Sequence, residues 1–261
     1  MLSGTTRVTG KPIGGYVGQA APPPWMSFGM LDPQQLPPWR RPGFGLVVQI
    51  GFHESPLEPA GAVALRARRT LEAAGLWNDV LAFCYGEEWY ARFDAGAFAA
   101  YGLPAGHPEG VHIIRDYVGR QQIEIVQATG RPIVWVTPEV TAERQPPPAT
   151  TYVAIDRYPV DGEAPEAYGA ALIANERATS LPLVLIPRWF RSTGPQQGPA
   201  WQLASEEPSR AAIQVAARVL ARPRWVAAVG FLWTSRPHAE LVGLADMPAT
   251  RAAVESLFVG V

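Results

Sequence analysis

The segment Leu81–Tyr90 reads LAFCYGEEWY, a strand-like run that ends in two carboxylates and two aromatic residues. Side chains along a strand point alternately to opposite faces. Small residues therefore share one face with Glu88, and large apolar residues share the other with Glu87. This pattern indicates a strand with a crowded interior on one side and helices on the other. We expect Glu88 to point into the mouth of a barrel, and Glu87 to face the helix layer and form a salt bridge.

Other apolar runs supply the remaining strands of this barrel. Six clear runs and two weaker ones near the N-terminus predict strands. In chain order they are Ile13–Gly18, Trp25–Met30, Gly45–Phe52, Val80–Gly86, Pro132–Val136, Tyr152–Asp156, Leu183–Ile186 and Val226–Trp233. Helical spacing between them predicts helices at Ala60–Ala74, His112–Thr129, Ala164–Ala178, Ser209–Ala221 and Thr250–Phe258. Only the proline-rich Thr141–Thr150 separates the fifth and sixth strands, so we expect no helix there.

The order of these elements predicts the fold class. Strands that alternate with helices pair in parallel, and eight such units indicate an irregular (β/α)8 TIM barrel of the α/β class. We expect one domain over residues 1–261, with residues 1–24 a loop-rich segment that includes the first strand. An open doubly wound sheet is the alternative. The sequence has no Gly-x-Gly-x-x-Gly motif after a strand and no phosphate loop, which argues against a nucleotide-binding protein with a doubly wound sheet.

Composition restricts the partners of the chain. The formal net charge is −1, which favours neither nucleic acid nor an anionic membrane. Cys84 is the only cysteine, so no intrachain disulfide forms, and we interpret it as a packing residue. The N-terminus lacks the apolar run of a signal peptide, and no segment reaches transmembrane length. We therefore expect a soluble protein, cytoplasmic or part of a virion or other assembly. The sequence leaves its oligomeric state open.

Chemistry in such a barrel takes place at the carboxyl ends of the strands. The carboxylates expected there are Glu88, Glu139 and Asp156. The other polar and aromatic candidates are His53, Trp89, Tyr158, Arg188, Trp189 and Trp233. Aromatic rings cover the apolar faces of sugars, and carboxylates accept hydrogen bonds from hydroxyl groups. The set predicts a carbohydrate site. The four histidines lack the spacing of metal ligands, and no metal or organic cofactor is implied.

Glycoside hydrolysis assigns roles to these residues. It needs an acid to protonate the leaving oxygen and usually a second carboxylate as nucleophile or base. Glu88 is the candidate acid, and Asp156 and Glu139 are its candidate partners. The tryptophans are candidate stacking platforms, and Tyr158 and His53 are polar contacts. Asp156 also has a structural interpretation as the cap of a turn.

Several motifs point to one family. Tyr85–Trp89 reads YGEEW, and Pro132–Val136, Tyr152–Pro159 and Gly230–Trp233 follow in order. With these motifs the chain resembles the glycoside hydrolase-type TIM barrels related to the cellulase superfamily. Those barrels carry an Asn-Glu or Asp-Glu pair at the end of strand four, and the resemblance implies that Glu88 is the general acid/base. It also implies that Trp233 forms the floor of the sugar site.

One departure from the family concerns the nucleophile. The family carries a catalytic Glu at the end of strand seven, where Leu185–Phe190 reads LIPRWF without a carboxylate. An inverting route would use Asp156 or Glu139 as the base, and a substrate-assisted route would use Asp156 and Tyr158 to orient the sugar. A barrel that only binds glycan is also open, and Arg188 suits a ligand with a carboxylate.

Three functional hypotheses follow. The first is a glycoside hydrolase-like enzyme that acts on a polysaccharide or a peptidoglycan-type glycan. The second is a non-catalytic glycan-binding or structural barrel, for example a module of a phage particle or a surface assembly. The third, a phosphate-binding barrel enzyme, is weaker because Ser192–Gly198 is a poor phosphate loop.

Overall fold

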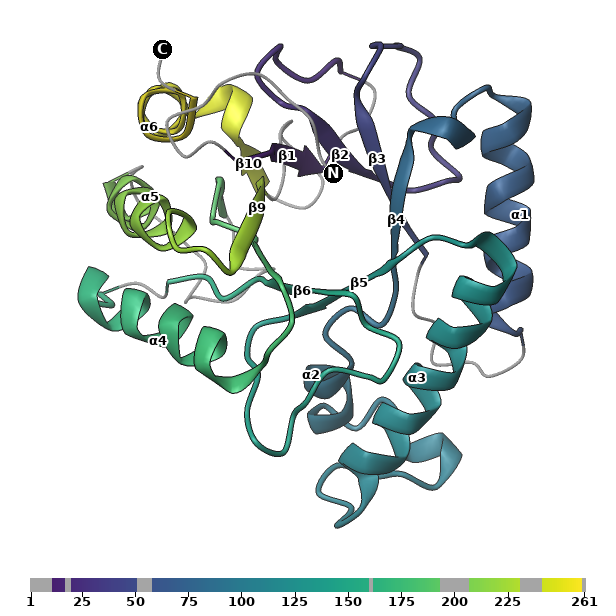
Figure 1. Cartoon of the computed structure of the whole chain (residues 1–261). Helices are drawn as coiled ribbons and strands as arrows, with labels where there is room; N and C mark the ends of the chain where they lie inside the picture. Colours follow the sequence, from purple (N-terminus) through teal and green to yellow (C-terminus); the bar gives the residue numbers. More distant parts are fainter. Residues whose placement is uncertain are drawn as a thin grey trace.

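The protein folds as a closed barrel surrounded by helices. A computed structural model describes residues 11–16, 20–50, 58–159, 162–192, 207–230 and 241–259. Eight strands form the barrel in the order β1-β2-β3-β4-β5-β6-β7-β9, and helices lie around its outside (Figure 1). Each strand pairs in parallel with its neighbours. The predicted (β/α)8 TIM barrel is confirmed, and the open doubly wound sheet is excluded.

Each barrel strand overlaps one of the eight predicted runs. The strands are β1 (Ile13–Tyr16), β2 (Phe28–Leu31), β3 (Gly45–Gln49), β4 (Val80–Cys84), β5 (Ile133–Thr137), β6 (Tyr152–Ile155), β7 (Leu183–Leu185) and β9 (Trp225–Gly230). The first and last of them close the barrel, because Ile13 of β1 is opposite Ala228 of β9.

The predicted helices also form. They are α1 (Ala60–Ala73), α3 (Gly110–Thr129), α4 (Pro165–Ala178), α5 (Glu207–Leu220) and α6 (Pro248–Val254). Gly130 ends α3 in the left-handed conformation, and its N–H donates to the carbonyl of Val126 at 2.8 Å. Residues 138–151, between β5 and β6, contain no helix, as the proline-rich sequence predicts.

The structure adds elements that the sequence patterns did not predict. Helix α2 (Trp89–Asp94) begins directly after the acidic pair. Strand β8 (Phe190–Ser192), after β7, pairs antiparallel with β10 (Leu241–Gly243), after β9, outside the barrel. Short helical turns occupy η1 (Trp77–Asp79), η2 (Ala99–Tyr101), η6 (Leu244–Asp246) and η7 (Glu255–Val259).

Two apolar clusters form the core. One fills the space between the barrel and the helices, and the other, which we call the lumen cluster, lies inside the barrel. The lumen cluster contains Phe28, Met30, Val47, Ala82, Cys84, Val134, Val136, Ala154, Val184, Ile186, Ala227 and Val229. In β4, Ala82 and Cys84 face the lumen and Phe83 faces the helices, as the alternation predicts.

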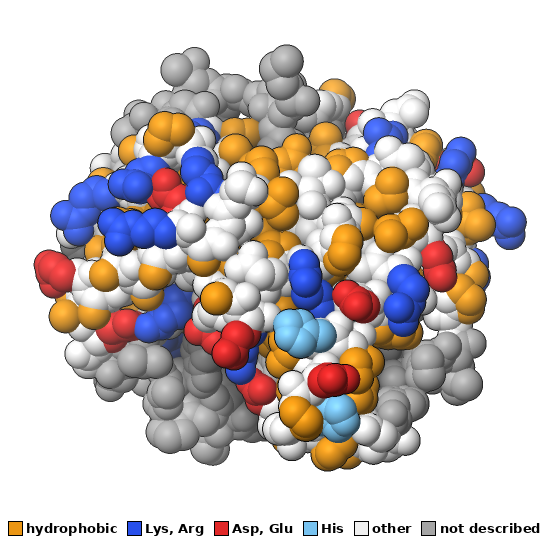
Figure 2. All heavy atoms as spheres, turned by 60° about the horizontal axis from the view of Figure 1, so that its bottom comes forward, with side chains coloured by type: hydrophobic (Ala, Val, Ile, Leu, Met, Phe, Trp, Pro, Cys, Tyr) orange, Lys and Arg blue, Asp and Glu red, His pale blue; other side chains and the backbone are white. Residues whose placement is uncertain are grey.

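The surface carries mixed charges. Figure 2 shows basic and acidic side chains beside one another on one face of the molecule. Within the described ranges, no helix combines the length and the apolar character needed to cross a membrane.

Candidate functional site

The end of β4 turns sharply before the acidic pair. The strand ends at Cys84, Gly86 has φ +84°, and Glu88 has φ +49° and ψ +29°. Residues with positive φ on both sides of Glu87 stop the strand alternation, so Glu87 does not continue on the helix-facing side. Its carboxylate instead accepts a hydrogen bond from Nε2 of Gln49, at the end of β3, and another from Tyr16, at the end of β1. The prediction that Glu87 faces the helix layer is therefore wrong.

Strand β5 holds Glu88 and Asp156 next to each other. The backbone N–H of Glu88 donates to the carbonyl of Val136 at 3.0 Å, and that of Asp156 donates to the carbonyl of Thr137 at 3.2 Å. These two acceptors are consecutive residues at the end of β5. A hydrogen bond joins the side chains of Glu88 and Asp156. We call Glu87, Glu88 and Asp156 the carboxyl cluster.

Burial changes the proton affinity of the carboxyl cluster. Asp156 is 5% exposed, and this burial, followed by the charge of Glu88 and their hydrogen bond, raises its pKa well above its usual range. Burial and the charge of Glu88 also raise the pKa of Glu87, while the hydrogen bond from Gln49 opposes the rise. Asp156 thus keeps a proton at pH values where an exposed aspartate has lost it.

One oxygen of Asp156 has no hydrogen-bond partner among the described residues. Its Oδ1 is buried, and no group in the described part of the chain donates a hydrogen bond to it. A buried polar atom without a partner costs about 1–3 kcal/mol, so native proteins rarely leave one unless it serves a purpose. This atom is therefore an acceptor that remains available to a hydrogen-bond donor.

Two tyrosines border the carboxyl cluster. Burial, and then the negative charges of the cluster, raise the pKa of Tyr16 and of Tyr158 above the usual value. Among these charges, Glu87 has the largest effect on the pKa of Tyr16, and Asp156 has the largest effect on that of Tyr158. Both phenols therefore stay protonated and can donate hydrogen bonds. Tyr158 was predicted, whereas Tyr16 was not, although its place at the end of the first strand was an available signal.

Cys84 lies in the lumen beneath the cluster. It is fully buried, and burial followed by the charges of Glu87 and Asp156 raises the pKa of its thiol well above its usual range. A protonated, enclosed thiol is a poor nucleophile, which agrees with the predicted packing role.

The two described candidate tryptophans are enclosed. Trp89 is 0% exposed and its ring lies on Tyr90, with 3.5 Å between the ring centroids. Trp189 is 1% exposed, packs edge-on against Trp25 and covers Gly230. Neither ring presents an open face in this geometry, so their role as stacking platforms stays a prediction.

Arg188 is buried, with 1% of its surface exposed. Its Nη1 donates to the carbonyl of Pro159 at 2.9 Å, its Nε donates to that of Phe190 at 3.4 Å, and its guanidinium lies 5.4 Å from the Phe190 ring centroid. In this position it joins the segment after β6 to β8. Its role in binding a ligand carboxylate is still only predicted.

Glu139 occupies a different environment from the carboxyl cluster. Its side chain is half exposed and pairs with Nη1 of Arg144 at 3.0 Å, and Arg144 also pairs with Asp94 at 2.7 Å. The carboxylates that raise the pKa of Asp156 are Glu88 and Glu87. The structure thus places Glu87, and not Glu139, beside Glu88, the predicted acid.

Two predicted contacts, His53 and Trp233, lie outside the described residues. Across the ranges that the structure does describe, no group of three or more His, Cys, Asp or Glu side chains is arranged to hold a metal ion.

Comparisons with known proteins concern the fold. No family model and no curated protein matches the chain. Among solved structures it is similar to β-glucuronidase 2 of Bacteroides uniformis, with a TM-score of 0.51 and 10% identity over 85% of this chain and 30% of that one. A β-glucuronidase of an uncultured Clostridium species has a TM-score of 0.46 and 12% identity over 73% of this chain and 34% of that one. The GH53 catalytic domain of Ignisphaera aggregans has a TM-score of 0.47 and 10% identity, covering 81% and 73% of the two chains.

The chain spans about a third of the length of these two β-glucuronidases. At identities this low, the likeness establishes the fold alone, a TIM barrel.

Proposed function

We propose that the protein is a glycoside hydrolase-like barrel that acts on a polysaccharide or a peptidoglycan-type glycan, with Glu88 as the general acid. The observation that carries this proposal is the hydrogen-bonded pair of Glu88 and Asp156 after β4 and β6. Glycoside hydrolysis needs a protonated carboxyl group beside the scissile bond, and the carboxyl ends of barrel strands are where catalytic groups lie in this fold.

The raised pKa of Asp156 supports proton delivery by this pair. Asp156 holds its proton to a higher pH than an exposed aspartate does, and we propose that it donates this proton to Glu88 along the hydrogen bond. In the proposed step Glu88 gives this proton to the leaving glycosidic oxygen. The proton released when water attacks the sugar then returns to the pair, which restores the starting state.

Glu87 adds a third carboxylate that the sequence interpretation had placed elsewhere. Gln49 and Tyr16 donate hydrogen bonds to the Glu87 carboxylate and fix its orientation. Because Leu185–Phe190 contains no carboxylate, another group has to act as the base. We propose Glu87 as the candidate base in this scheme, because Asp156 supplies the proton; Glu139, which pairs with Arg144, is the alternative base. Because the pKa of Glu87 is raised, it becomes an effective base only as the pH rises through that pKa.

The second candidate function is a glycan-binding or structural barrel without catalysis, for example a module of a phage particle or a surface assembly. The sequence of Leu185–Phe190 favours it, because the nucleophile of the resembled family is missing there. The unpaired Oδ1 of Asp156 and the hydroxyl groups of Tyr16 and Tyr158 suit binding of sugar hydroxyls as well as catalysis.

Hydrolysis of a panel of bacterial and plant polysaccharides, measured as released reducing ends, distinguishes the two functions. Wild type should release sugars, and Glu88→Gln should lower kcat by about 100- to 10,000-fold while the protein stays folded. The matched control is Glu72→Gln, which removes an exposed carboxylate on α1 that pairs with Arg68, and it should leave kcat unchanged. Glu87→Gln and Glu139→Gln, compared in the same assay, identify the base.

The opposite result would overturn the enzymatic proposal. If wild type releases nothing from any substrate, and wild type and Glu88→Gln are retained equally on a glycan column, the binding function replaces it. Equal hydrolysis by both proteins would exclude Glu88 as the acid.

A further inference from the structure

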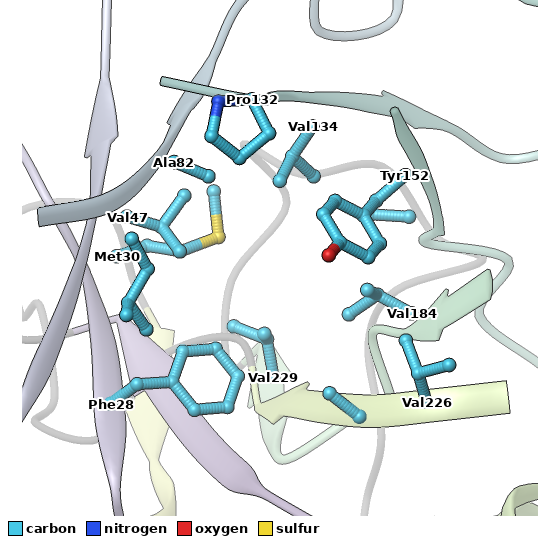
Figure 3. Close-up of a pocket in the computed structure, with 13 residues that line it drawn as sticks. Phe28, Met30, Val47, Ala82, Pro132, Val134, Tyr152, Val184, Val226 and Val229 are labelled. Carbon is cyan, nitrogen blue, oxygen red and sulfur yellow. The ribbon is translucent and has the colours of Figure 1, made fainter. Parts of the chain in front are cut away.

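The barrel lumen contains a cavity at the opposite end of the strands from the carboxyl cluster. A cavity of about 210 Å³ lies inside the barrel, lined by side chains of β2 to β7 and β9 and of residues beside them (Figure 3). Tyr152 is the one lining residue with a hydroxyl group, and none carries a charge. The ring of Tyr152 points into the cavity opposite Met30 and Val47 (Figure 3).

Small side chains leave this space open. Barrel interiors are normally filled by layers of bulky branched residues. Here Ala82, Ala154 and Ala227, from β4, β6 and β9, are buried members of the lumen cluster and line the cavity. Three alanines at lumen positions provide too little volume to fill the centre at the usual packing density.

Two irregularities in the strand pairing form the rim of the cavity. The register shifts between Leu46 and Val47 opposite β4, and between Leu183 and Val184 opposite β9. Each shift adds one unpaired residue to the longer strand, Leu81 in β4 and Val226 in β9. Both residues line the cavity beside the alanine that follows them.

The rim faces solvent at the amino-terminal end of the barrel. Leu81, Pro132, Tyr152 and Val226 stand at or next to the starts of their strands, and each is half-buried. Leu81 fits over Gly45, where an added Cβ would lie 2.2 Å from its Cδ1. A ligand can therefore enter from this end.

A layer of buried side chains separates the cavity from the carboxyl cluster. Cys84, Val136 and Ile186 belong to the lumen cluster, lie further along their strands than the lining residues, and are at most 1% exposed. A ligand in the cavity consequently has no contact with Glu88 or Asp156.

We propose that this cavity binds a small apolar molecule of bicyclic aromatic size with a single hydrogen-bonding group, of the indole type, held by the hydroxyl of Tyr152. A dry cavity of about 150 Å³ binds benzene, so one about 1.4 times larger suits a ligand of about eight or nine non-hydrogen atoms. The apolar lining excludes charged ligands, because they would lose their hydration without gaining a partner. One hydroxyl group at the rim matches one polar group on the ligand.

Methionine methyl groups provide a direct test in the unmodified protein. The chain has only four methionines, and Met30 lines the cavity whereas the buried Met247 does not. In NMR spectra of protein with methyl-labelled methionine, added indole should shift the Met30 methyl signal, because of the ring current of the aromatic ligand. The shift should saturate at one indole bound per chain, and the Met247 methyl signal should not move. No shift at Met30, or an equal shift at both methyl groups, would overturn the proposal.

A matched pair of substitutions locates the ligand. Ala154→Leu fills the cavity and should weaken indole binding at least tenfold, while Ala62→Leu, the same substitution at an exposed position of α1, should leave it unchanged. At ten times the dissociation constant, indole should raise the thermal midpoint of wild type by about 3–5 °C. Unchanged binding by a folded Ala154→Leu protein would refute the site.

A second variant keeps the test decisive if Ala154→Leu does not fold. Tyr152→Phe keeps the ring and removes the hydroxyl, and it should weaken indole binding by about 2- to 10-fold. Binding of naphthalene, which has no hydrogen-bonding group, should not change. Equal weakening for both ligands, or for neither, would exclude the proposed hydrogen bond and with it this assignment of the ligand.

Discussion

Gly86 controls how the carboxyl cluster is presented, and Gly86→Ala tests this. The residue has φ +84°, and an added Cβ would lie 2.8 Å from Cγ1 of Val118 on α3. The left-handed conformation costs an L-residue about 1–2 kcal/mol. Overpacking of a filled interior costs a further 1–3 kcal/mol or so. We therefore expect Gly86→Ala to lower the free energy of unfolding by about 2–5 kcal/mol.

Gly75 supplies the matched control. It has φ +69°, and an added Cβ would meet nothing within 4 Å. Gly75→Ala should thus lower the free energy of unfolding by only the conformational part, about 1–2 kcal/mol. The difference between the two substitutions measures the contact with Val118. In a double-mutant cycle with Val118→Ala, the two costs should be less than additive, because the smaller side chain removes the clash.

Urea denaturation with a common m-value measures these differences. If Gly86→Ala costs no more than Gly75→Ala, or if the cycle with Val118→Ala is additive, then α3 does not press on this turn and the argument fails. A hydrolysis or glycan-binding assay of the folded Gly86→Ala protein then reports whether the same turn positions Glu88.

Three further predictions concern buried groups. Because folding raises the pKa of Asp156 above its ordinary 3.8, its stabilising contribution is complete below that pH and is lost as the pH rises through the folded pKa. Asp156→Asn cannot ionise, so its free energy of unfolding relative to wild type should increase from pH 4 to pH 8 in urea titrations; a decrease contradicts the raised pKa. Asn175→Ala removes the acceptor of the buried N–H of Val140 and should lower stability by about 1–3 kcal/mol, whereas Asn175→Asp, which keeps that acceptor, should cost less. Gly230→Ala would place a Cβ 1.5 Å from Cε3 of Trp189, so we expect a loss of about 3 kcal/mol or more, seen as lost cooperative unfolding and partly restored by Trp189→Leu.

The barrel could be predicted because its signals are local. Apolar runs with a period of two mark the strands, and Gly130 and Pro165 mark where helices end and begin. Helix α2 was missed, since its first residues continue the aromatic run after β4 and form only six residues of helix. The antiparallel pair of β8 and β10 depends on segments about 50 residues apart, which no local pattern joins.

The candidate site was harder to predict from the sequence than the barrel, because the backbone conformation after β4 determines where the site side chains lie. Strand alternation places Glu87 on the wrong side as soon as Gly86 and Glu88 adopt positive φ. A glycine directly before the acidic pair was the available signal. The enclosure of Trp89 and Trp189 also depends on tertiary packing, since a tryptophan at a strand end packs against protein as readily as against a ligand.

The pairing of β1 with β9 has a consequence for biosynthesis. Its partners, such as Ile13 and Ala228, are separated by most of the chain, so the last ladder of the barrel cannot form until Trp225–Gly230 has left the ribosome. Until then, nascent β1 and β7 each expose an unpaired edge that invites intermolecular pairing. A stalled or truncated chain that ends before β9 should therefore aggregate or require a chaperone, whereas one released after β9 can bury both edges within itself.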